Sequence, residues 1–334
     1  MEWLKILSGF TPVVIFLSIL LAFDSFKLVS YKLVTKVLLL GGMAAVFSLF
    51  LNQWLNESLQ ISFILYVRYA APFLEEFLKS LVVVFYLRSS KIGFLLDAAI
   101  IGFTVGTGFA IIENLYNYQT SEISLSEWIL RGFGTAVMHG VTTAIFALIA
   151  KYFIDRYRST ASYLFLPGFV SSVSIHSLYN HLVVPLEILI FIQLIIFPIL
   201  FWIVFKRTEK AMHHWLEVGL DAEVGLLAYL VSGKISRTKA GEYLEDLKKV
   251  FPGEKVADML CYLRLYLELG IRAKGILLME QSGFQLSPDD DVREKLDELK
   301  FLEDSIGKTG KRAIAAIFRT DPVEIWQIHL LKDR

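Results

Sequence analysis

Seven stretches of this sequence are long and apolar enough to cross a lipid bilayer, and they constrain the fold more than any other feature. A membrane-spanning helix needs about 20 predominantly apolar residues, because the hydrocarbon layer is about 30 Å thick. The sequence therefore predicts an all-α fold, a polytopic membrane helix bundle of about seven spans. We place the spans near residues 6–23, 36–52, 61–87, 92–113, 128–150, 162–184 and 186–205.

The overall composition supports a membrane protein and excludes other classes. Hydrophobic residues make up 55% of the 334 residues, and the mean hydropathy is +0.56, whereas soluble proteins are roughly 45–50% apolar. A formal net charge of zero gives no bulk attraction for nucleic acid. Cys261 is the single cysteine, which excludes an internal disulfide and a thiolate metal cluster. We expect a lipid bilayer around the chain and no nucleic-acid partner.

Lysine and arginine alternate between the loops that join the spans. The loops near 53–60, 114–127 and 181–187 contain neither residue. The other loops carry Lys27, Lys32, Lys36, Arg88, Lys91, Lys151, Arg156, Arg158, Lys206, Arg207 and Lys210. Because positively charged loops are retained in the cytoplasm, we predict an extracytoplasmic N-terminus and a cytoplasmic C-terminus, in a bacterial inner (plasma) membrane. That arrangement requires an odd number of spans.

The character of the chain changes at Lys206. Beyond it, charges of both signs interleave with apolar residues at helical spacing, as in "AGEYLEDLKKVF" and "DMLCYLRLYLELG", a pattern typical of soluble helices. We therefore predict two domains: a seven-span membrane domain over residues 1–205 and a soluble, cytoplasmic helical domain over residues 206–334. Nothing in the sequence identifies a partner for the second domain.

The third span contains charges that a simple membrane anchor does not need. Its sequence "RYAAPFLEEFLKSLVVVFYL" places Glu75, Glu76 and Lys79 among apolar residues. A charge at the centre of a span costs roughly 2.5–3.5 kcal/mol on insertion scales, so such residues usually face the bundle interior and have a function. One glutamate can be neutralised by Lys79 while the other points into the bundle. We favour Glu76 as the partner of Lys79 and a functional role for Glu75.

Three further spans each contribute polar side chains. Glu113 ends the fourth span in "GTGFAIIENLYNY", and His139 lies near the middle of the fifth in "GTAVMHGVTTAIF". The sixth contains His176 and, four residues later, Asn180 in "SVSIHSLYNHLVV". A single histidine in a membrane helix can be explained by a hydrogen bond to a neighbouring helix. Four spans with such groups are more than a structural bundle needs.

Taken together, "EEFLK", "FAIIE", "HGVTT" and "HSLYN" resemble the successive motifs of the PrsW family of membrane proteases, part of a wider group with the CAAX prenyl endopeptidases and the Abi proteins. The resemblance covers spans three to six and leaves the C-terminal domain unexplained. It implies hydrolysis of a peptide bond in a membrane-anchored protein substrate. The implied catalytic residues are Glu75, Glu76, Glu113, His139, His176 and Asn180.

The resemblance also implies roles for these residues. Glu75 would be the general base that deprotonates water, and Asn180 would donate to the oxyanion of the scissile carbonyl. Glu113, His139 and His176 could hold a divalent metal, with Zn²⁺ as the candidate. The same residues could also work without metal, Glu75 activating water while the two histidines stabilise the oxyanion.

Two other classes of function remain open from the sequence. Intramembrane carboxylates and histidines also build proton relays, so a proton-coupled transporter is one alternative. The sequence has no repeated pattern between its halves, which many transporters show. The other alternative is a non-catalytic membrane adaptor. Substitution of Glu75 separates the three: it would abolish cleavage in a protease, flux in a transporter, and neither in an adaptor.

Overall fold

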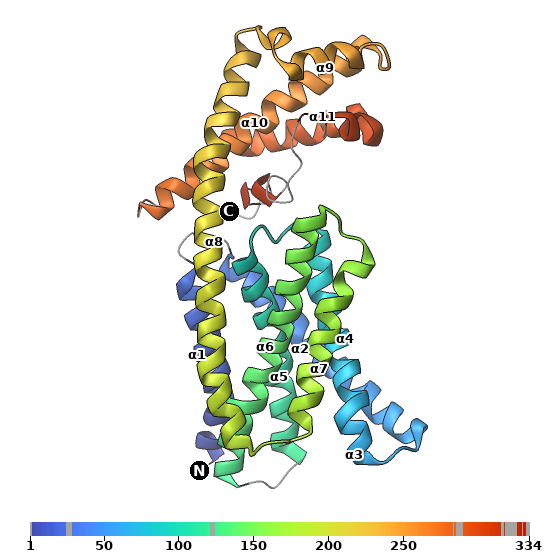
Figure 1. Cartoon of the computed structure of the whole chain (residues 1–334), viewed down its shortest axis with the longest axis vertical. Coiled ribbons are helices and arrows are strands. Elements are labelled where there is room, and N and C mark those ends of the chain that lie inside the picture. Colours follow the sequence, from blue (N-terminus) through green and yellow to red (C-terminus); the bar gives the residue numbers. More distant parts are fainter. Residues whose placement is uncertain are drawn as a thin grey trace. The chain divides into compact units, whose positions relative to one another are not determined.

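The computed structural model describes residues 2–24, 29–120, 124–282, 284, 290–314, 317, 326–328 and 330–331, and all regular structure within these ranges is helical (Figure 1). The all-α prediction is therefore confirmed for this part of the chain. The chain divides into two compact units, Met1–Thr208 and Glu209–Arg334. The assignment of one unit to the membrane and the other to the cytoplasm stays a prediction.

Each predicted span overlaps one helix or one helical run of the first unit. These are α1 (Glu2–Phe23), α2 (Tyr31–Leu59), α3 (Phe63–Leu65), the π-helical turn η1 (Tyr66–Ala70), α4 (Ala71–Arg88), α5 (Leu95–Thr120), α6 (Leu125–Tyr157), the 3₁₀ turn η2 (Ser162–Phe165), α7 (Leu166–Asn180) and α8 (Leu186–Val231). The third span is thus not one uniform helix, because a π-helical turn joins α3 to α4.

By length and hydropathy alone, four of the described helices could cross a membrane: α2, α5, α6 and α8. α7 has 15 residues, and α4 carries Glu75, Glu76, Lys79 and Arg88 within its 18. The four charged residues of α4 and the short length of α7 explain why neither helix meets the length and hydropathy criterion for a membrane span. The count of seven spans therefore stays a prediction.

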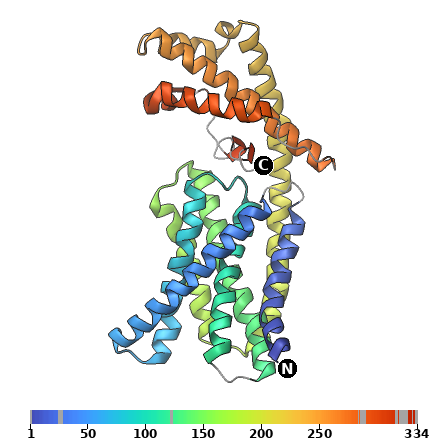
Figure 2. The ribbon, with the colours of Figure 1, turned by 180° about the vertical axis from the view of Figure 1, so that it is seen from behind.

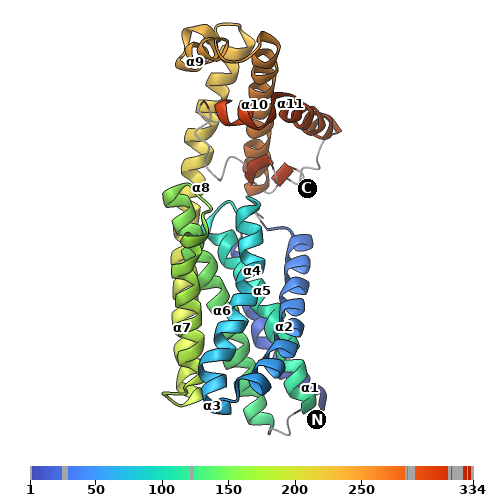
Figure 3. The ribbon, with the colours of Figure 1, turned by 90° about the vertical axis from the view of Figure 1, so that its right-hand side faces the viewer.

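Helix α5 lies within the bundle and positions the other helices of the first unit. It packs against α6, α2 and α1, and every residue from Leu96 to Ala110 is buried. Figure 3 shows α5 between α6 and α2, and Figure 2 shows α2 running obliquely across the bundle. A Cβ at Gly106 would lie 2.1 Å from the His139 carbonyl oxygen, and one at Gly108 would lie 2.1 Å from that of Leu38. Only glycine allows these backbone contacts.

The second unit contains the C-terminal part of α8, η3 (Ile235–Arg237), α9 (Lys239–Leu247), α10 (Gly253–Gln281) and α11 (Asp290–Ile314). Gly307, with φ 68° and ψ 177°, interrupts the helical geometry of α11. The core includes Leu244, Met259, Leu263, Leu267, Leu299 and Ile306. Helix α8 continues past residue 205, where the last span was predicted to end, because its sequence has no glycine or proline stop there.

Candidate active site

Four helices of the first unit bring charged and imidazole side chains to one place in the bundle. Helix α4 supplies Glu75, Glu76 and Lys79, while α5, α6 and α7 supply Glu113, His139 and His176. The two imidazole rings meet edge to face with their centroids 4.9 Å apart. The contacts around these side chains define different roles for residues that look alike in the sequence.

Glu76 is buried, and one of its oxygens has three polar neighbours. Its Oε1 accepts from Lys79 Nζ at 2.5 Å and from Thr142 Oγ1 at 3.1 Å. His176 Nδ1 lies 2.8 Å from the same oxygen. Because an ionised carboxylate only accepts hydrogen bonds, a neutral His176 carries its proton on Nδ1 and leaves Nε2 as an acceptor. The expected pairing of Glu76 with Lys79 is thus present.

His139 lies between a cation and a carboxylate. Lys79 Nζ is 3.0 Å from its Nδ1, and Glu113 Oε2 is 2.5 Å from its Nε2. An ammonium group is a donor only, so a neutral His139 carries its proton on Nε2, toward Glu113. The Phe109 ring lies 4.9 Å from Lys79 Nζ and 5.2 Å from the His139 ring. This phenylalanine, four residues before Glu113, packs against the lysine–histidine contact.

Glu75 is placed differently from its neighbour Glu76. Its side chain is 13% exposed, against 1% for Glu76. Oε1 accepts from Asn52 Nδ2 of α2 at 3.3 Å, and Oε2 lies 3.9 Å from His176 Nε2. Asn52 Oδ1 in turn accepts from the Tyr66 hydroxyl at 2.6 Å. Asn52 and Tyr66 were not among the residues predicted from the sequence; the amide of Asn52 at the end of the second predicted span was the available signal.

Asn180 does not contact the other predicted site residues through any hydrogen bond that the structure gives. Its Nδ2 donates to the Val67 carbonyl at 2.9 Å, and Ser177 Oγ donates to the Arg68 carbonyl at 2.6 Å. Both acceptors belong to the π-helical turn η1. The oxyanion role of Asn180 stays a prediction, and the structure adds a contact with the backbone that precedes α4.

The donor atoms are arranged in a way that a metal ion could use. Among the described acidic, histidine and cysteine residues, the group with atoms within 4.8 Å of one another is Glu75, His139 and His176. This set contains Glu75 in place of the expected Glu113. Two imidazoles and a carboxylate are a ligand set that Zn²⁺ commonly uses in proteins, so these residues fit a metal.

The two histidines are not equivalent as candidate ligands. Metal-binding histidines usually donate their other ring N–H to a carboxylate or carbonyl. His176 has this arrangement, since its Nδ1 faces Glu76. His139 Nδ1 faces the Lys79 ammonium instead. His176 is therefore better oriented than His139 to bind a metal ion.

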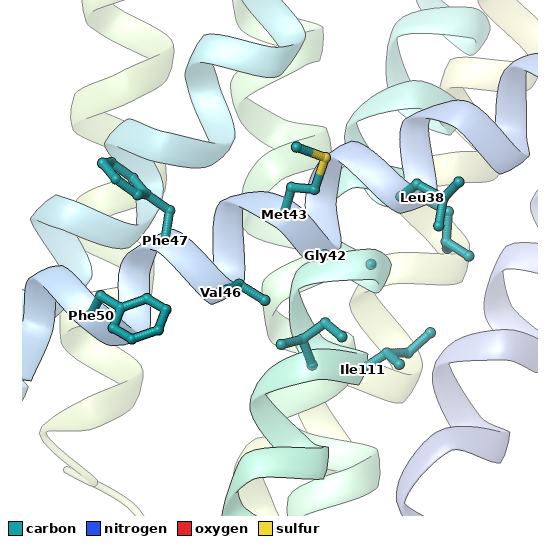
Figure 4. Close-up of a pocket in the computed structure, with 10 residues that line it drawn as sticks. Leu38, Gly42, Met43, Val46, Phe47, Phe50 and Ile111 are labelled. Atoms are coloured by element: carbon teal, nitrogen blue, oxygen red, sulfur yellow. The ribbon is translucent and has the colours of Figure 1, made fainter.

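A separate apolar pocket of about 580 Å³ lies between α2 and α5 (Figure 4). Its lining is apolar and comprises Leu38, Leu39, Gly42, Met43, Val46, Phe47, Phe50, Gly108, Ile111 and Ile112. These side chains offer no group for acid–base chemistry. The chemistry of this unit therefore belongs to the carboxylates and histidines described above.

Comparison with protein families agrees with this site. The model described as PrsW family intramembrane metalloprotease matches residues 29–204, more than half of the chain. The matched range contains every residue of the candidate site. Comparisons with curated proteins and with solved structures gave no match. The chain is an integral membrane protein that belongs to the PrsW family of intramembrane metalloproteases.

Proposed function

We propose that this protein hydrolyses a peptide bond in a membrane-anchored protein substrate, with Glu75 as the group that activates water. The proposal rests on the different surroundings of two adjacent glutamates. Glu76 is neutralised by Lys79, whereas Glu75 is partly exposed and faces the acceptor nitrogen of His176 at 3.9 Å. A water molecule can bridge polar atoms at such a distance.

The chemistry follows from these positions. Glu75 takes a proton from water, and the oxygen attacks the carbonyl carbon of the substrate. The C–N bond then breaks as Glu75 returns the proton to the leaving amine, giving a carboxylic acid and an amine. Asn180, whose amide nitrogen has a second N–H besides the one that bonds to the Val67 carbonyl, is the candidate donor to the oxyanion. Lys79 holds Glu76 and His139 in place through its short contacts with both.

A divalent metal, with Zn²⁺ as the candidate, would be held by His176 and His139 together with Glu75 or Glu113. When bound, such an ion polarises the scissile carbonyl and makes water a better nucleophile at neutral pH. The support is the close approach of the donor atoms of Glu75, His139 and His176, together with the description of the family. Glu76 would then orient His176 through Nδ1.

The proposed topology places the N-terminus outside and the unit after Thr208 in the cytoplasm. The support is the alternation of lysine and arginine between loops. A cysteine at residue 120, in a chain where Cys261 is replaced by serine, should react with a membrane-impermeant maleimide from outside. Reaction from the cytoplasmic side alone would reverse the proposed orientation.

The test of function is the Glu75→Gln variant, compared with wild type on single-span membrane reporters that differ in their juxtamembrane sequence. Glutamine keeps the volume and removes the base, so we expect cleavage to fall by about 10²–10⁴-fold, with the protein still assembled. Glu57→Gln, on an exposed glutamate of α2, is the matched control. Cleavage by Glu75→Gln at the wild-type rate would reject the assigned base.

A further inference from the structure

The π-helical turn η1 lies directly before the helix that carries Glu75. The Ala71 N–H bonds to the Tyr66 carbonyl, five residues back instead of the usual four. The Val67 carbonyl thereby loses its α-helical donor, the Ala71 N–H, and the Arg68 carbonyl has no donor because residue 72 is proline, which lacks an N–H. In a membrane they must be satisfied by protein groups. Two side chains of α7 do this: Asn180 Nδ2 bonds to the Val67 carbonyl and Ser177 Oγ to the Arg68 carbonyl.

The turn also changes which face of the helix Tyr66 occupies. In a continuous α-helix, at about 100° per residue, residues nine apart lie on opposite faces. Tyr66 and Glu75 would then point in opposite directions. The one extra residue of the π turn removes about 100° of that rotation. Tyr66 and Glu75 can therefore both reach Asn52 on α2.

Asn52 connects the side chains of Tyr66 and Glu75, and its amide group has one orientation that satisfies both contacts. The Tyr66 hydroxyl donates to Asn52 Oδ1 at 2.6 Å, so the amide nitrogen faces Glu75. That nitrogen also lies 3.1 Å from Ser48 Oγ. A flipped amide would place its oxygen against the carboxylate, with two acceptors facing each other. Tyr66 is 4% exposed, so water does not readily replace its hydroxyl.

We propose that this π-helical turn is a positioning device for Glu75: α7 holds the turn, the turn places Tyr66 against Asn52, and Asn52 holds the carboxylate. Tyr66 and Asn52 are thus positioning residues, and Ser177 secures the turn. The inference rests on the proposed function of Glu75. Small displacements of a reacting group can cost about 100-fold in rate, which gives such a device its value.

The kinetic test uses Tyr66→Phe, Asn52→Leu and the double variant on a reporter that the wild type cleaves. We expect each single variant to lower kcat about tenfold, the effect of one lost hydrogen bond, with KM unchanged. The double variant should be no slower than the slower single variant, because both act on one chain of contacts. Tyr163→Phe, in η2 and 68% exposed, is the control, and it should cleave normally.

A second readout needs no substrate. Dicyclohexylcarbodiimide, an apolar reagent for carboxyl groups, is applied to the purified protein, and modification of Glu75 is measured by mass spectrometry. Asn52 covers Oε1, so Tyr66→Phe and Asn52→Leu should raise the labelling rate at least threefold. Ser177→Ala should raise it too, whereas Ser171→Ala, whose hydroxyl bonds within α7 to the Pro167 carbonyl, should leave it unchanged.

The outcomes separate this inference from the proposed function. Wild-type cleavage by Glu75→Gln would reject the function. An inactive Glu75→Gln, together with wild-type kcat and labelling in Tyr66→Phe and Asn52→Leu, would reject the positioning device alone. Loss of thermal stability in these variants, with kcat, KM and labelling of the folded protein unchanged, would also overturn it.

Discussion

In the described part of each unit, a fully buried lysine is paired with a glutamate at 2.5 Å. In the first unit Lys79 pairs with Glu76, and in the second Lys274 of α10 pairs with Glu223 of α8. Their further neighbours differ. Lys79 also contacts His139, whose other nitrogen faces Glu113. Near Lys274 lie the Gln327 amide oxygen at 3.2 Å and the Trp215 ring at 4.5 Å.

The comparison shows that a buried ion pair does not by itself identify a chemical site. Burying two charges is costly, and a well-made pair roughly offsets that cost. Around Lys274 an amide and an indole complete the pair and join α8, α10 and the segment at 326–328. Around Lys79 the pair continues into two histidines and two more carboxylates, groups that can move protons or bind a cation. We infer that Lys274 stabilises the fold of the second unit, whereas Lys79 also positions the side chains of the candidate active site.

Replacing Lys79 by methionine should have the largest effect. The change leaves the Glu76 carboxylate buried without its cation, which typically costs about 3–5 kcal/mol of stability. It also removes the group that orients His139, so cleavage should be undetectable even in the folded fraction. Thermal unfolding in detergent and reporter cleavage measure the two effects. A stable, fully active variant would show that the lysine has no special place in the site.

Loss of both histidines should come next, with an effect on bound metal. If the site holds a metal, His139→Ala combined with His176→Ala should reduce it from roughly one equivalent to background in elemental analysis. Glu76→Gln should weaken affinity by about 10–100-fold, measured by competition with a chelating dye, because it removes the partner of His176. Glu223→Gln, in the other buried pair, should bind metal as the wild type does.

One result would reject the metal altogether. Sub-stoichiometric metal in an active wild-type preparation, with activity indifferent to chelator, would leave the glutamate and histidine mechanism standing.

Replacing Lys274 by methionine should destabilise the protein without changing its chemistry. Glu223, whose side chain is 13% exposed, would lose its cation, and we expect a loss of up to about 3 kcal/mol. Cleavage per folded molecule should match the wild type, in contrast with Lys79→Met. Reporter cleavage below the unfolding temperature checks this. A large loss of kcat at full stability would show that the second unit takes part in the reaction.

The smallest effect should come from an exposed pair. Lys249 and Asp246 are 2.7 Å apart, but their side chains are 78% and 68% exposed. Water screens such pairs, and many contribute nothing measurable. Lys249→Ala should therefore leave both the unfolding temperature and cleavage unchanged. A clear drop in unfolding temperature would mean that burial does not explain the difference between this pair and the buried ones.

Much of the fold and the composition of the site could be predicted from the sequence. Apolar windows predicted the helices of the first unit because a helix in lipid satisfies its own backbone and needs only length and hydrophobicity. Charges inside those windows indicated a site, since each is costly unless it has a function. The spacing of these residues was also sufficient to suggest the family that the comparison later identified.

Contacts between helices decided the rest. Glu75 and Glu76 are both within reach of Lys79 along the helix, so spacing alone allowed either pairing; the positions of His176 and Thr142 decide for Glu76. Glu113, expected in the metal-binding set, lies against His139, while Glu75 completes the closer group. These arrangements join residues far apart in the chain, and local periodicity carries no information about them.

The start of α4 shows most clearly what the sequence determines and what the tertiary structure decides. The sequence by itself determined that an apolar helix here carries two glutamates and a lysine. The tertiary structure decided that a π-helical turn precedes it, because two carbonyls of that turn find donors on α7, more than 100 residues later in the sequence. Pro72, which has no N–H for the Arg68 carbonyl, allows a break in the helical hydrogen bonding here. The distant donors on α7 satisfy the carbonyls at that break, and through Tyr66 and Asn52 the turn reaches the carboxylate of Glu75.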